Sequence, residues 1–565
     1  MSFERIVAFL VLVTICLPSF FIAKGVLGKL SNLSVRENRV YTLIFGLILA
    51  SLFTFPFLFI GIKFVYYSVA VQFFIALLLY LQSAKFGEMN NSAKADLGLI
   101  LCLSLVLVLS MVFISKLSLP AYTDSIHHYK SINDFFLIKI GSTELFPGLP
   151  ERFYHYGYHL FIAQAAQLSN IPISELMLAS GPFFILFFSL GIYALTLTIT
   201  KQAELALLST SLLSLISIFP SFAQNWGKYP TLFSLSMISF PLFLIYRLFD
   251  QKSRKTYKTE ILLLLISILV VGFAHFRSLI YLSIFAFSMF LTNKVPNSSI
   301  WNKVKLIIIT LSFSLAIVEV FKTSIPLVSR IFWLIAICLA LFFVIMKGIS
   351  QSDNFLLTAS MVFVISLLLV KLPLTGSLAR YSNLIDWPFY RISLFYPAGM
   401  LVIFLIKKFS EIEAIEISAK PYFWILLLIS LSLFPYQKKL VPEDRYILAE
   451  AEQLKAIEWL KANYTASGVW VLAPGEWMGD YMEVTDSSGW INPLTGIDVE
   501  LIPSTTEFES EKQADLLCEN QFIIYIDKSN KTASFDENKF PPNLYRTIYN
   551  HEPIRIVEPV CNKSP

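Results

Sequence analysis

Apolar runs long enough to cross a lipid bilayer recur along the first 435 residues of the chain. A membrane-spanning helix needs about 20 consecutive apolar residues. The chain is 56% hydrophobic, contains 51 phenylalanines and only 15% charged residues, and has a mean hydropathy of +0.67. A water-soluble protein could not bury so much apolar surface. We therefore predict a polytopic membrane protein whose first 435 residues form an all-α helical bundle.

The apolar runs predict about 14 transmembrane helices. Ten of them fall at residues 6–27, 97–117, 175–200, 205–222, 261–272, 279–291, 307–320, 331–346, 355–370 and 422–434. Two more fall within residues 41–82 and hinge near Lys63, one ends near Arg247, and one ends before Lys407. The first run lacks a small-residue cleavage site and is expected to be retained rather than removed as a signal peptide. With this count the Lys/Arg-rich loops all lie on one side, as the positive-inside rule requires of the cytoplasmic face. Both chain ends and residues 118–158 then lie outside the cytoplasm.

Residues 436–565 have a soluble composition and predict a small extracytoplasmic α/β domain. Residues 450–464 carry apolar side chains at helical spacing, and VWVLAP, FIIYID and IRIVEPV are typical of buried strands. Cys518 and Cys561 lie here, so one disulfide can form if the domain is extracytoplasmic. Cys16, Cys102 and Cys338 lie in apolar runs and are expected to be core residues. The domain has no phosphate-binding loop or nucleophile elbow, which favours a substrate-recognition or structural role.

Titratable residues concentrate in one polar segment, Thr123 to His159, within the predicted outer loop. The segment contains Asp124, His127, His128, Asp134, Glu144, Glu151, Arg152, His155 and His159. Asp124 and His128 are four residues apart, as are His155 and His159, so on helices each pair would share a face. Imidazole and carboxylate groups are ligands of divalent metals. We therefore predict a reaction centre here, with a metal held by Asp124, His128, His155 and His159.

Asp124 is also the candidate for proton transfer, because a carboxylate next to His128 at the membrane surface could take a proton from a hydroxyl acceptor. Two alternatives remain open for these residues. The histidines and tyrosines could belong to an interfacial aromatic belt. Asp124 could cap the helix that follows it.

Further polar residues are expected on the same side of the membrane although they are distant in sequence: Trp226, Lys228, His275, Arg277, Arg380 and Arg391. Guanidinium groups bind phosphate oxygens in a fork, which suits a lipid phosphate. Trp226 could stack on a sugar or belong to the belt, and Asp386 could orient one arginine. The arginines could alternatively extend to lipid headgroups without a specific ligand.

These motifs resemble the GT-C superfamily of membrane glycosyltransferases. An outer loop with TDSIHH, then YHYGYH, many short spans and an α/β tail with AIEWLKANY and GVWVLAPGEWMGDYM is similar to its multi-spanning prokaryotic members. Asp124 and His128 match their Asp-x-x-x-His motif. Tyr154, Gly157, Tyr158 and His159 match their Tyr-Pro-Pro-Gly-(aromatic)-His stretch.

The resemblance implies inverting transfer of a sugar from a polyprenyl-phosphate or polyprenyl-diphosphate carrier to a glycan, lipid or protein acceptor on the outer face of the plasma membrane. Asp124 would be the base or a metal ligand, with His128 and His159 assisting. The cations and Tyr154 would contribute to the lipid-phosphate site.

Two other functions remain open on the sequence. A flippase for lipid-linked saccharides would need polar groups distributed through the spans. A non-catalytic scaffold for envelope assembly would not need the polar segment. The net charge of +5 is sorted among loops, so no nucleic-acid partner is expected.

Overall fold

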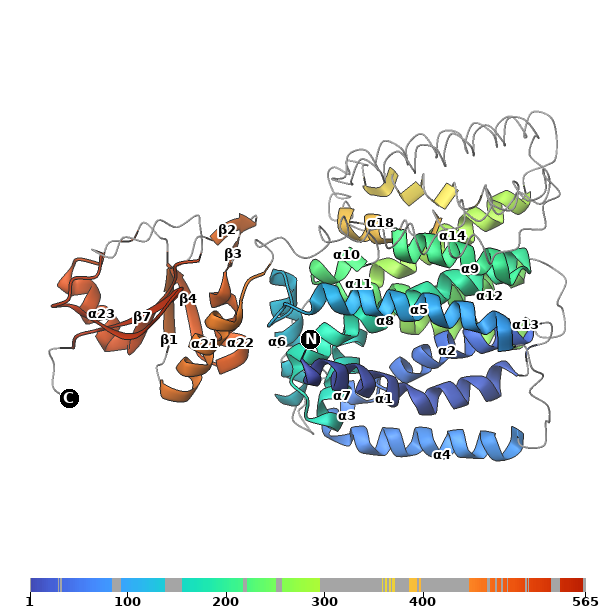
Figure 1. Cartoon of the computed structure of the whole chain (residues 1–565), viewed down its shortest axis with the longest axis horizontal. Helices are drawn as coiled ribbons and strands as arrows, with labels where there is room; N and C mark the ends of the chain where they lie inside the picture. Colours follow the sequence, from blue (N-terminus) through green and yellow to red (C-terminus); the bar gives the residue numbers. More distant parts are fainter. Residues whose placement is uncertain are drawn as a thin grey trace.

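The chain folds into a helical bundle with a small α/β domain at one end of it (Figure 1). The structure is a computed structural model. It describes residues 2–28, 30, 33–83, 93–137, 155–216, 221–249, 257–294, 358, 361–362, 365–366, 368–370, 386–393, 396–397, 447–464, 468–472, 475–478, 481–484, 486–502, 506, 508–529 and 539–561.

Seven helices in the described part of the chain are long and apolar enough to cross a membrane. They are Phe3–Leu27, Val35–Ile60, Ile62–Leu79, Leu97–Ile114, Ile173–Thr200, Tyr229–Phe249 and Tyr257–Ala274, and two shorter apolar helices are Ala203–Leu215 and Phe276–Thr292. These helices correspond to the spans that the sequence predicts before residue 295, which confirms a membrane protein with a helical bundle. The later predicted spans lie wholly or largely outside the described residues, so the total of about 14 stays a prediction.

The first part of the bundle consists of α1 (Phe3–Leu27), α2 (Val35–Leu52), α3 (Phe57–Ile60), η1 (Ile62–Phe64), α4 (Val65–Ser83) and α5 (Ala93–Ile114). A capping box starts α2: Glu37 N donates to Ser34 Oγ over 3.2 Å, and Ser34 N donates to the Glu37 carboxylate over 2.9 Å. The hinge expected near Lys63 lies at Gly61, whose φ of 81° is a conformation that glycine adopts at little cost.

The second part consists of α6 (Thr123–Leu137), α7 (Gly157–Ser169), α8 (Ile173–Thr200), α9 (Ala203–Ser211), the π-helix η2 (Leu212–Ile216), α10 (Ser221–Asn225), α11 (Tyr229–Met237), α12 (Ser239–Phe249), α13 (Tyr257–Ala274), α14 (Phe276–Lys294) and the short α18 (Trp387–Ser393). Helix α8 runs through the core, where 89% of its most apolar window is buried. Figure 1 shows α6, α7, α10 and the N-terminus at the end of the bundle that faces the C-terminal domain.

Charged residues in the bundle are paired near helix ends. Arg5 at the start of α1 contacts Glu175 at the start of α8 over 3.0 Å and is only 3% exposed. Its guanidinium also donates to the carbonyl of Leu117 over 2.8 Å, which anchors the segment leading into α6. Pairing matters here because an unpaired charge buried in an apolar bundle is strongly destabilising.

The C-terminal domain contains α21 (Ala451–Asn463), β1 (Gly468–Leu472), β2 (Gly475–Met478), β3 (Tyr481–Val484), η7 (Ser487–Trp490), α22 (Ile491–Thr495), β4 (Asp498–Ile502), α23 (Glu511–Asn520), β5 (Phe522–Asp527), β6 (Tyr545–His551) and β7 (Ile554–Pro559). Its main sheet has the order β4-β1-β5-β7-β6. Strand β1 is parallel to β4 and β5, whereas β7 is antiparallel to its neighbours. The α/β character expected for this domain is therefore confirmed. The predicted boundary at residue 435 lies outside the described residues.

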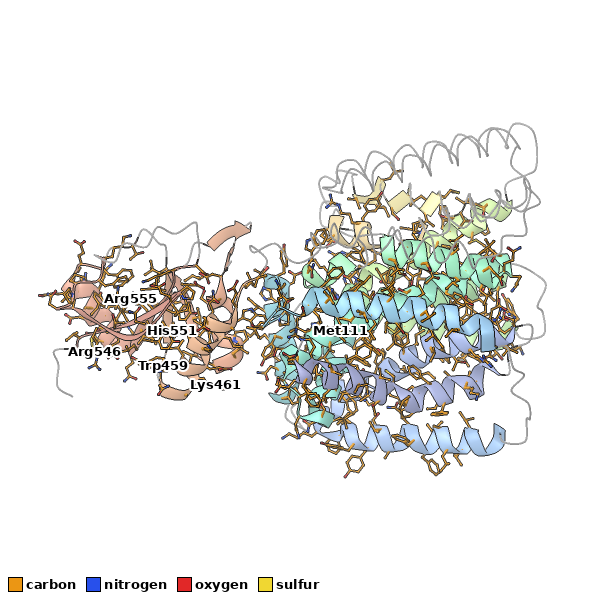
Figure 2. All side chains as sticks on the ribbon, viewed as in Figure 1. Met111, Trp459, Lys461, Arg546, His551 and Arg555 are labelled. Atoms are coloured by element: carbon orange, nitrogen blue, oxygen red, sulfur yellow. A yellow bond between two sulfur atoms is a disulfide. The ribbon has the colours of Figure 1, made fainter. Side chains whose placement is uncertain are left out.

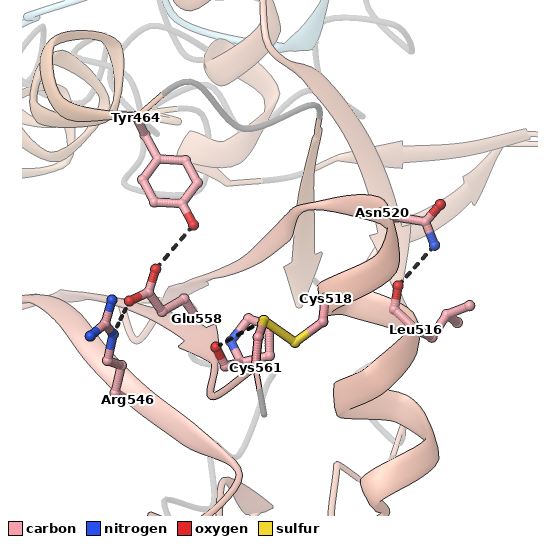
Figure 3. The surroundings of a disulfide bond; sticks show 8 residues. Tyr464, Leu516, Cys518, Asn520, Arg546, Glu558 and Cys561 are labelled. Atoms are coloured by element: carbon pink, nitrogen blue, oxygen red, sulfur yellow. Dashed lines mark hydrogen bonds and ion pairs between the residues drawn. A yellow bond between two sulfur atoms is a disulfide. The ribbon is translucent and has the colours of Figure 1, made fainter. Parts of the chain in front are cut away.

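A disulfide joins Cys518 of α23 to Cys561 after β7 (Figure 3). Next to it, Glu558 of β7 accepts a hydrogen bond from the Tyr464 hydroxyl over 3.2 Å and pairs with Arg546 of β6. Figure 2 shows Arg546 and Arg555 on this domain, away from the bundle. The cysteines expected in the core behave as predicted within the described residues, since Cys16 and Cys102 are free thiols and buried.

Helix α6 connects the two cores. Leu119, just before α6, belongs to the hydrophobic core of the C-terminal domain, and Ile126 and Tyr129 of α6 pack against that core. The Tyr129 ring meets Trp490 edge to face, with 5.6 Å between the ring centroids. The C-terminal domain therefore packs directly on the helix that carries Asp124 and His128.

We predict that replacing Cys518 and Cys561 together by serine destabilises the C-terminal domain. The disulfide closes a loop with a sequence separation of 43 residues, and its removal should lower the free energy of unfolding by about 4 kcal/mol. Pulse proteolysis of the detergent-purified protein across a urea series measures the loss. Cys102→Ser, in the bundle, is the control and should leave the midpoint of this domain unchanged. A double variant as resistant as the unaltered protein would contradict the prediction.

Candidate functional site

Helix α6 presents Asp124 and His128 to the bundle. Asp124 lies in its first turn and forms an ion pair with Lys228, while His128 lies one turn later and contacts His159 of α7. Asp124 and His128 therefore lie on the same face of α6, as expected for residues four positions apart on a helix. Both members of the ion pair are partly exposed, Lys228 by 23% and Asp124 by 31%, so the pair lies at the edge of the bundle.

Lys228 reaches Asp124 because the turn between α10 and α11 approaches α6 closely. Gly227 has a φ of 62°, and a Cβ atom there would lie 2.7 Å from Ser125 Oγ. Glycine is therefore required both for the backbone conformation and for the contact. The Lys228 amide donates to the Ala223 carbonyl over 3.1 Å, and its ammonium group lies 5.8 Å from the Tyr122 ring.

His128 and His159 form a buried imidazole pair. Their Nδ1 and Nε2 atoms are 3.0 Å apart, and the two side chains are 6% and 0% exposed. Burial is the main cause that lowers the pKa of both histidines well below the usual value, and nearby His155 lowers both further. Both imidazoles are therefore neutral near pH 7 and can share a proton through their hydrogen bond.

A second imidazole pair lies beside the first. The ring centroids of His155 and His275 are 4.3 Å apart, and His275 stacks on Phe389 of α18 at 5.3 Å. Burial, with Arg277 nearby, lowers the pKa of His155 to about 3, and burial also lowers the pKa of His275. His275 Nε2 is 3.2 Å from Thr231 Oγ1. We call His128, His155, His159 and His275 the histidine cluster.

The expected helical pairing of His155 with His159 is wrong. Helix α7 begins at Gly157, so His155 precedes the helix and turns to His275 instead. Gly157 packs against α13, where a Cβ atom would lie 2.9 Å from Ala274 Cα. Close contact between the helices therefore fixes where α7 begins.

Arg277 pairs with Asp386, as the sequence suggested for one of the arginines, with 3.1 Å between Nη1 and Oδ2. Asp386 also accepts a hydrogen bond from the Phe389 amide over 2.8 Å at the start of α18. Arg391 lies in the last turn of α18 and is half-buried. Asp386, just before α18, thus pairs with Arg277, and Phe389 of α18 stacks on His275 of the histidine cluster.

The remaining predicted site residues have different positions. Trp226 lies in the same turn as Lys228 and is half-buried, and His127 is exposed on α6. Tyr154 and Arg380 lie outside the described residues. Two aromatic residues that were not proposed as a pair stack beside the cluster: the rings of Tyr158 and Tyr229 are 5.9 Å apart and nearly parallel, at 10°. Tyr158 matches the aromatic position of the Tyr-Pro-Pro-Gly-(aromatic)-His stretch, but only the tertiary structure shows that it stacks on Tyr229.

Residues 45–331 match the model of a family of unknown function (DUF6541). The chain belongs to this family. The match spans most of the described bundle of this DUF6541 protein, including the histidine cluster, Asp124 and Lys228, but neither α18 nor the C-terminal domain.

No curated protein sequence matches the DUF6541 chain. Among solved structures, it is similar to the cryo-EM structure of the arabinofuranosyltransferase AftD from Mycobacteria, with a TM-score of 0.41 and 13% identity over 76% of this chain. The similarity covers 35% of AftD, so the DUF6541 chain spans about a third of that protein's length. So weak a similarity does not establish a shared fold.

The sequence predicts a metal site at Asp124, His128, His155 and His159. In the described part of this DUF6541 protein, no group of three or more His, Cys, Asp or Glu side chains is arranged so that it could hold a metal ion. His128 and His159 use ring nitrogens to bond each other, and Asp124 pairs with Lys228. The divalent metal therefore stays a prediction, and no chemical step below depends on it.

We predict that acidification from pH 7.5 to 5 destabilises the bundle through the histidine cluster. Each cluster pKa is lowered in the folded chain, so below about pH 6.5 the unfolded chain binds protons that the folded chain excludes. The penalty is absent above that range and grows as the pH falls. Thermal unfolding in detergent should show a weaker pH dependence for His155→Gln than for the unaltered protein. His551→Gln, at an exposed histidine, is the control and should keep the original dependence.

We predict that Gly227→Ala costs more stability than Gly496→Ala. Both glycines have a positive φ, of 62° and 78°, which costs another residue about 1–2 kcal/mol. Only Gly227 also faces close atoms, because a Cβ atom at Gly496 would meet nothing within 4 Å. Urea unfolding of the two variants, each compared with the unaltered protein, measures both costs. Equal costs would show that the approach of this turn to α6 is loose.

Proposed function

We propose that this protein is a membrane glycosyltransferase that moves a sugar from a polyprenyl-phosphate or polyprenyl-diphosphate carrier to an acceptor hydroxyl, with inversion. The observation that carries the proposal is the gathering of Asp124, Lys228, Arg277 and the histidine cluster at one end of an apolar bundle. A carboxylate that can take a proton and cations that can bind phosphate are the groups that such a transfer needs.

In the proposed reaction, the Asp124 carboxylate takes the proton from the acceptor hydroxyl. The acceptor oxygen attacks the anomeric carbon, the bond from that carbon to the phosphate oxygen breaks, and the polyprenyl phosphate leaves with the bonding electrons. Lys228 and Arg277 bind the phosphate and stabilise its growing negative charge. Arg391, and Arg380 with Tyr154 beyond the described residues, complete the proposed lipid-phosphate site.

The ion pairs of the site have a consequence for this reaction. The Asp124 carboxylate is engaged in an ion pair with the Lys228 ammonium group. A bound phosphate offers Lys228 a competing anion, which would release Asp124 for proton transfer. His128, on the same face of α6, is proposed to orient the acceptor, with His159 holding its ring.

Two observations support an outer location of the site in the plasma membrane. The Cys518–Cys561 disulfide suits an oxidising compartment. The domain that contains it packs on α6, so the site would lie on the same side. The acceptor, a glycan, lipid or protein, would then meet the donor away from the cytoplasm.

The flippase alternative receives less support from the described spans. Their charged residues, such as Arg5, Glu175 and Lys201, lie near helix ends, whereas a transport path needs polar groups near the middle of the membrane. The scaffold alternative does not account for three buried histidines and a half-buried one beside an ion pair.

We predict that Asp124→Asn lowers sugar transfer at least 100-fold, because it removes the proposed base. Transfer of radiolabelled sugar from a panel of polyprenyl-phosphate donors by the purified protein measures this. Asp134→Asn, on the same helix, is the control and should retain transfer. Sensitivity of the unaltered protein to a chelator would support the metal prediction.

Full transfer by Asp124→Asn would exclude this residue as the base. If no donor supports transfer by the unaltered protein, while the protein moves a lipid-linked saccharide across a vesicle membrane, the flippase function would replace the proposed one.

A further inference from the structure

Gln224 of α10 is buried without a hydrogen-bond partner. Its side chain is 2% exposed, and neither Oε1 nor Nε2 has a partner among the described residues. Gln164 also has an unpaired Oε1, but within the described part of the chain only Gln224 is a glutamine with both polar atoms buried and unpaired. Leaving such a group unpaired is destabilising, so its presence needs a reason.

Two other buried glutamines in the described part of the chain are paired. Gln72 of α4 is 1% exposed and accepts a hydrogen bond from Ser19 over 2.8 Å. Gln453 of α21 donates to Ser529 over 3.2 Å. Gln224 therefore differs from these two glutamines, because both of its polar side-chain atoms are buried and unpaired.

Gln224 lies against α8 at Gly181. A Cβ atom on Gly181 would come within 2.7 Å of Gln224 Oε1, so the lack of a side chain at Gly181 leaves space for the amide in its present position. Beside Gly181, the Ser180 hydroxyl is 3.4 Å from the Tyr158 hydroxyl. The Tyr158 ring in turn lies 6.0 Å from the His128 ring, so Tyr158 lies between Ser180 of α8 and the histidine cluster.

The same turn also carries Lys228. The Gly227 amide donates to the Gln224 carbonyl over 3.2 Å, and the next residue is the lysine that pairs with Asp124. One short segment therefore directs a cation towards α6 and an unpaired amide towards α8. A molecule with a phosphate and a second polar group could contact both.

The chemistry of the amide selects the kind of group it would bind. A carboxamide offers one acceptor and two donor hydrogens, whereas a phosphate only accepts and would leave Oε1 unpaired. A metal ion would leave Nε2 unpaired. A hydroxyl both donates and accepts, so neighbouring hydroxyls can satisfy both ends of the amide.

We infer that Gln224 binds hydroxyl groups of the sugar on the lipid-linked donor and so distinguishes the loaded carrier from the bare one. This inference rests on the proposed function, in which Lys228 binds the phosphate of the same molecule. Gly181 packs against the amide, and Tyr158 lies between Ser180 of α8 and the histidine cluster.

Gln224→Met tests the inference, because methionine has a similar size and no amide. The variant should have a higher apparent melting temperature in detergent, since it removes an unpaired buried group. It should also bind sugar-bearing lipid roughly tenfold more weakly, the effect of a lost hydrogen bond or two. Binding is measured by fluorescence quenching with farnesyl phosphate and with farnesyl phosphate that carries glucose, mannose, galactose or arabinose. Affinity for bare farnesyl phosphate should not change.

Gln72→Met is the matched control, since it makes the same substitution at a paired amide. It should lower the melting temperature, because Ser19 loses its partner, and leave the preference for sugar-bearing lipid unchanged.

The outcomes separate this inference from the proposed function. A Gln224→Met protein that still prefers sugar-bearing lipid, or an unaltered protein that binds farnesyl phosphate with and without sugar equally, overturns the role of Gln224 alone. Equal weakening for bare and loaded lipid also overturns it, because the amide would then act on the phosphate end. An unaltered protein that binds none of these lipids overturns the proposed function as well.

Discussion

The packing of α6 between two hydrophobic cores determines the geometry of the candidate site. One side of this helix places Ile126 and Tyr129 against the C-terminal domain, where Trp490 meets the tyrosine ring. The other side places Asp124 and His128 against the bundle. Because one short helix makes both contacts, the position of the C-terminal domain and the position of the Asp124 carboxylate depend on each other. The C-terminal domain therefore supports the site through its contact with α6.

Buried neutral imidazoles and paired charges give the site its electrostatic character. The histidine cluster is uncharged near pH 7 because burial penalises the imidazolium form. Lys228 forms an ion pair with Asp124, and Arg277 forms one with Asp386. In the proposed reaction, a phosphate takes the place of Asp124 as the partner of Lys228 and frees that carboxylate to accept a proton. The proposed glycosyl transfer uses this exchange, and the proposed role of Gln224 depends on Lys228 binding the phosphate of the same molecule.

Much of the bundle could be predicted from the sequence because transmembrane length and the four-residue helical spacing are local properties. The turn near Lys63, the pairing of α13 with α14 around His275, and the shared face of Asp124 and His128 all followed from such local patterns. The pairing of His155 with His159 could not, because it depended on where α7 begins, and the contact of Gly157 with Ala274 decides that. No sequence pattern marked Gln224 as a binding residue, because the burial of its amide and its lack of a hydrogen-bond partner depend on neighbours that only the tertiary structure brings together.

The sequence by itself determined that this is a membrane protein with an α/β domain after the bundle, and that titratable residues concentrate in one segment. Hydropathy and periodicity suffice for these conclusions, because each reflects how a stretch of chain meets lipid or water. Only the tertiary structure decided which charged group faces which. Lys228 reaches Asp124, and His275 reaches His155, across more than a hundred residues of chain because helices from distant segments pack side by side. Contacts of that kind depend on the packing of the whole bundle and have no local signature.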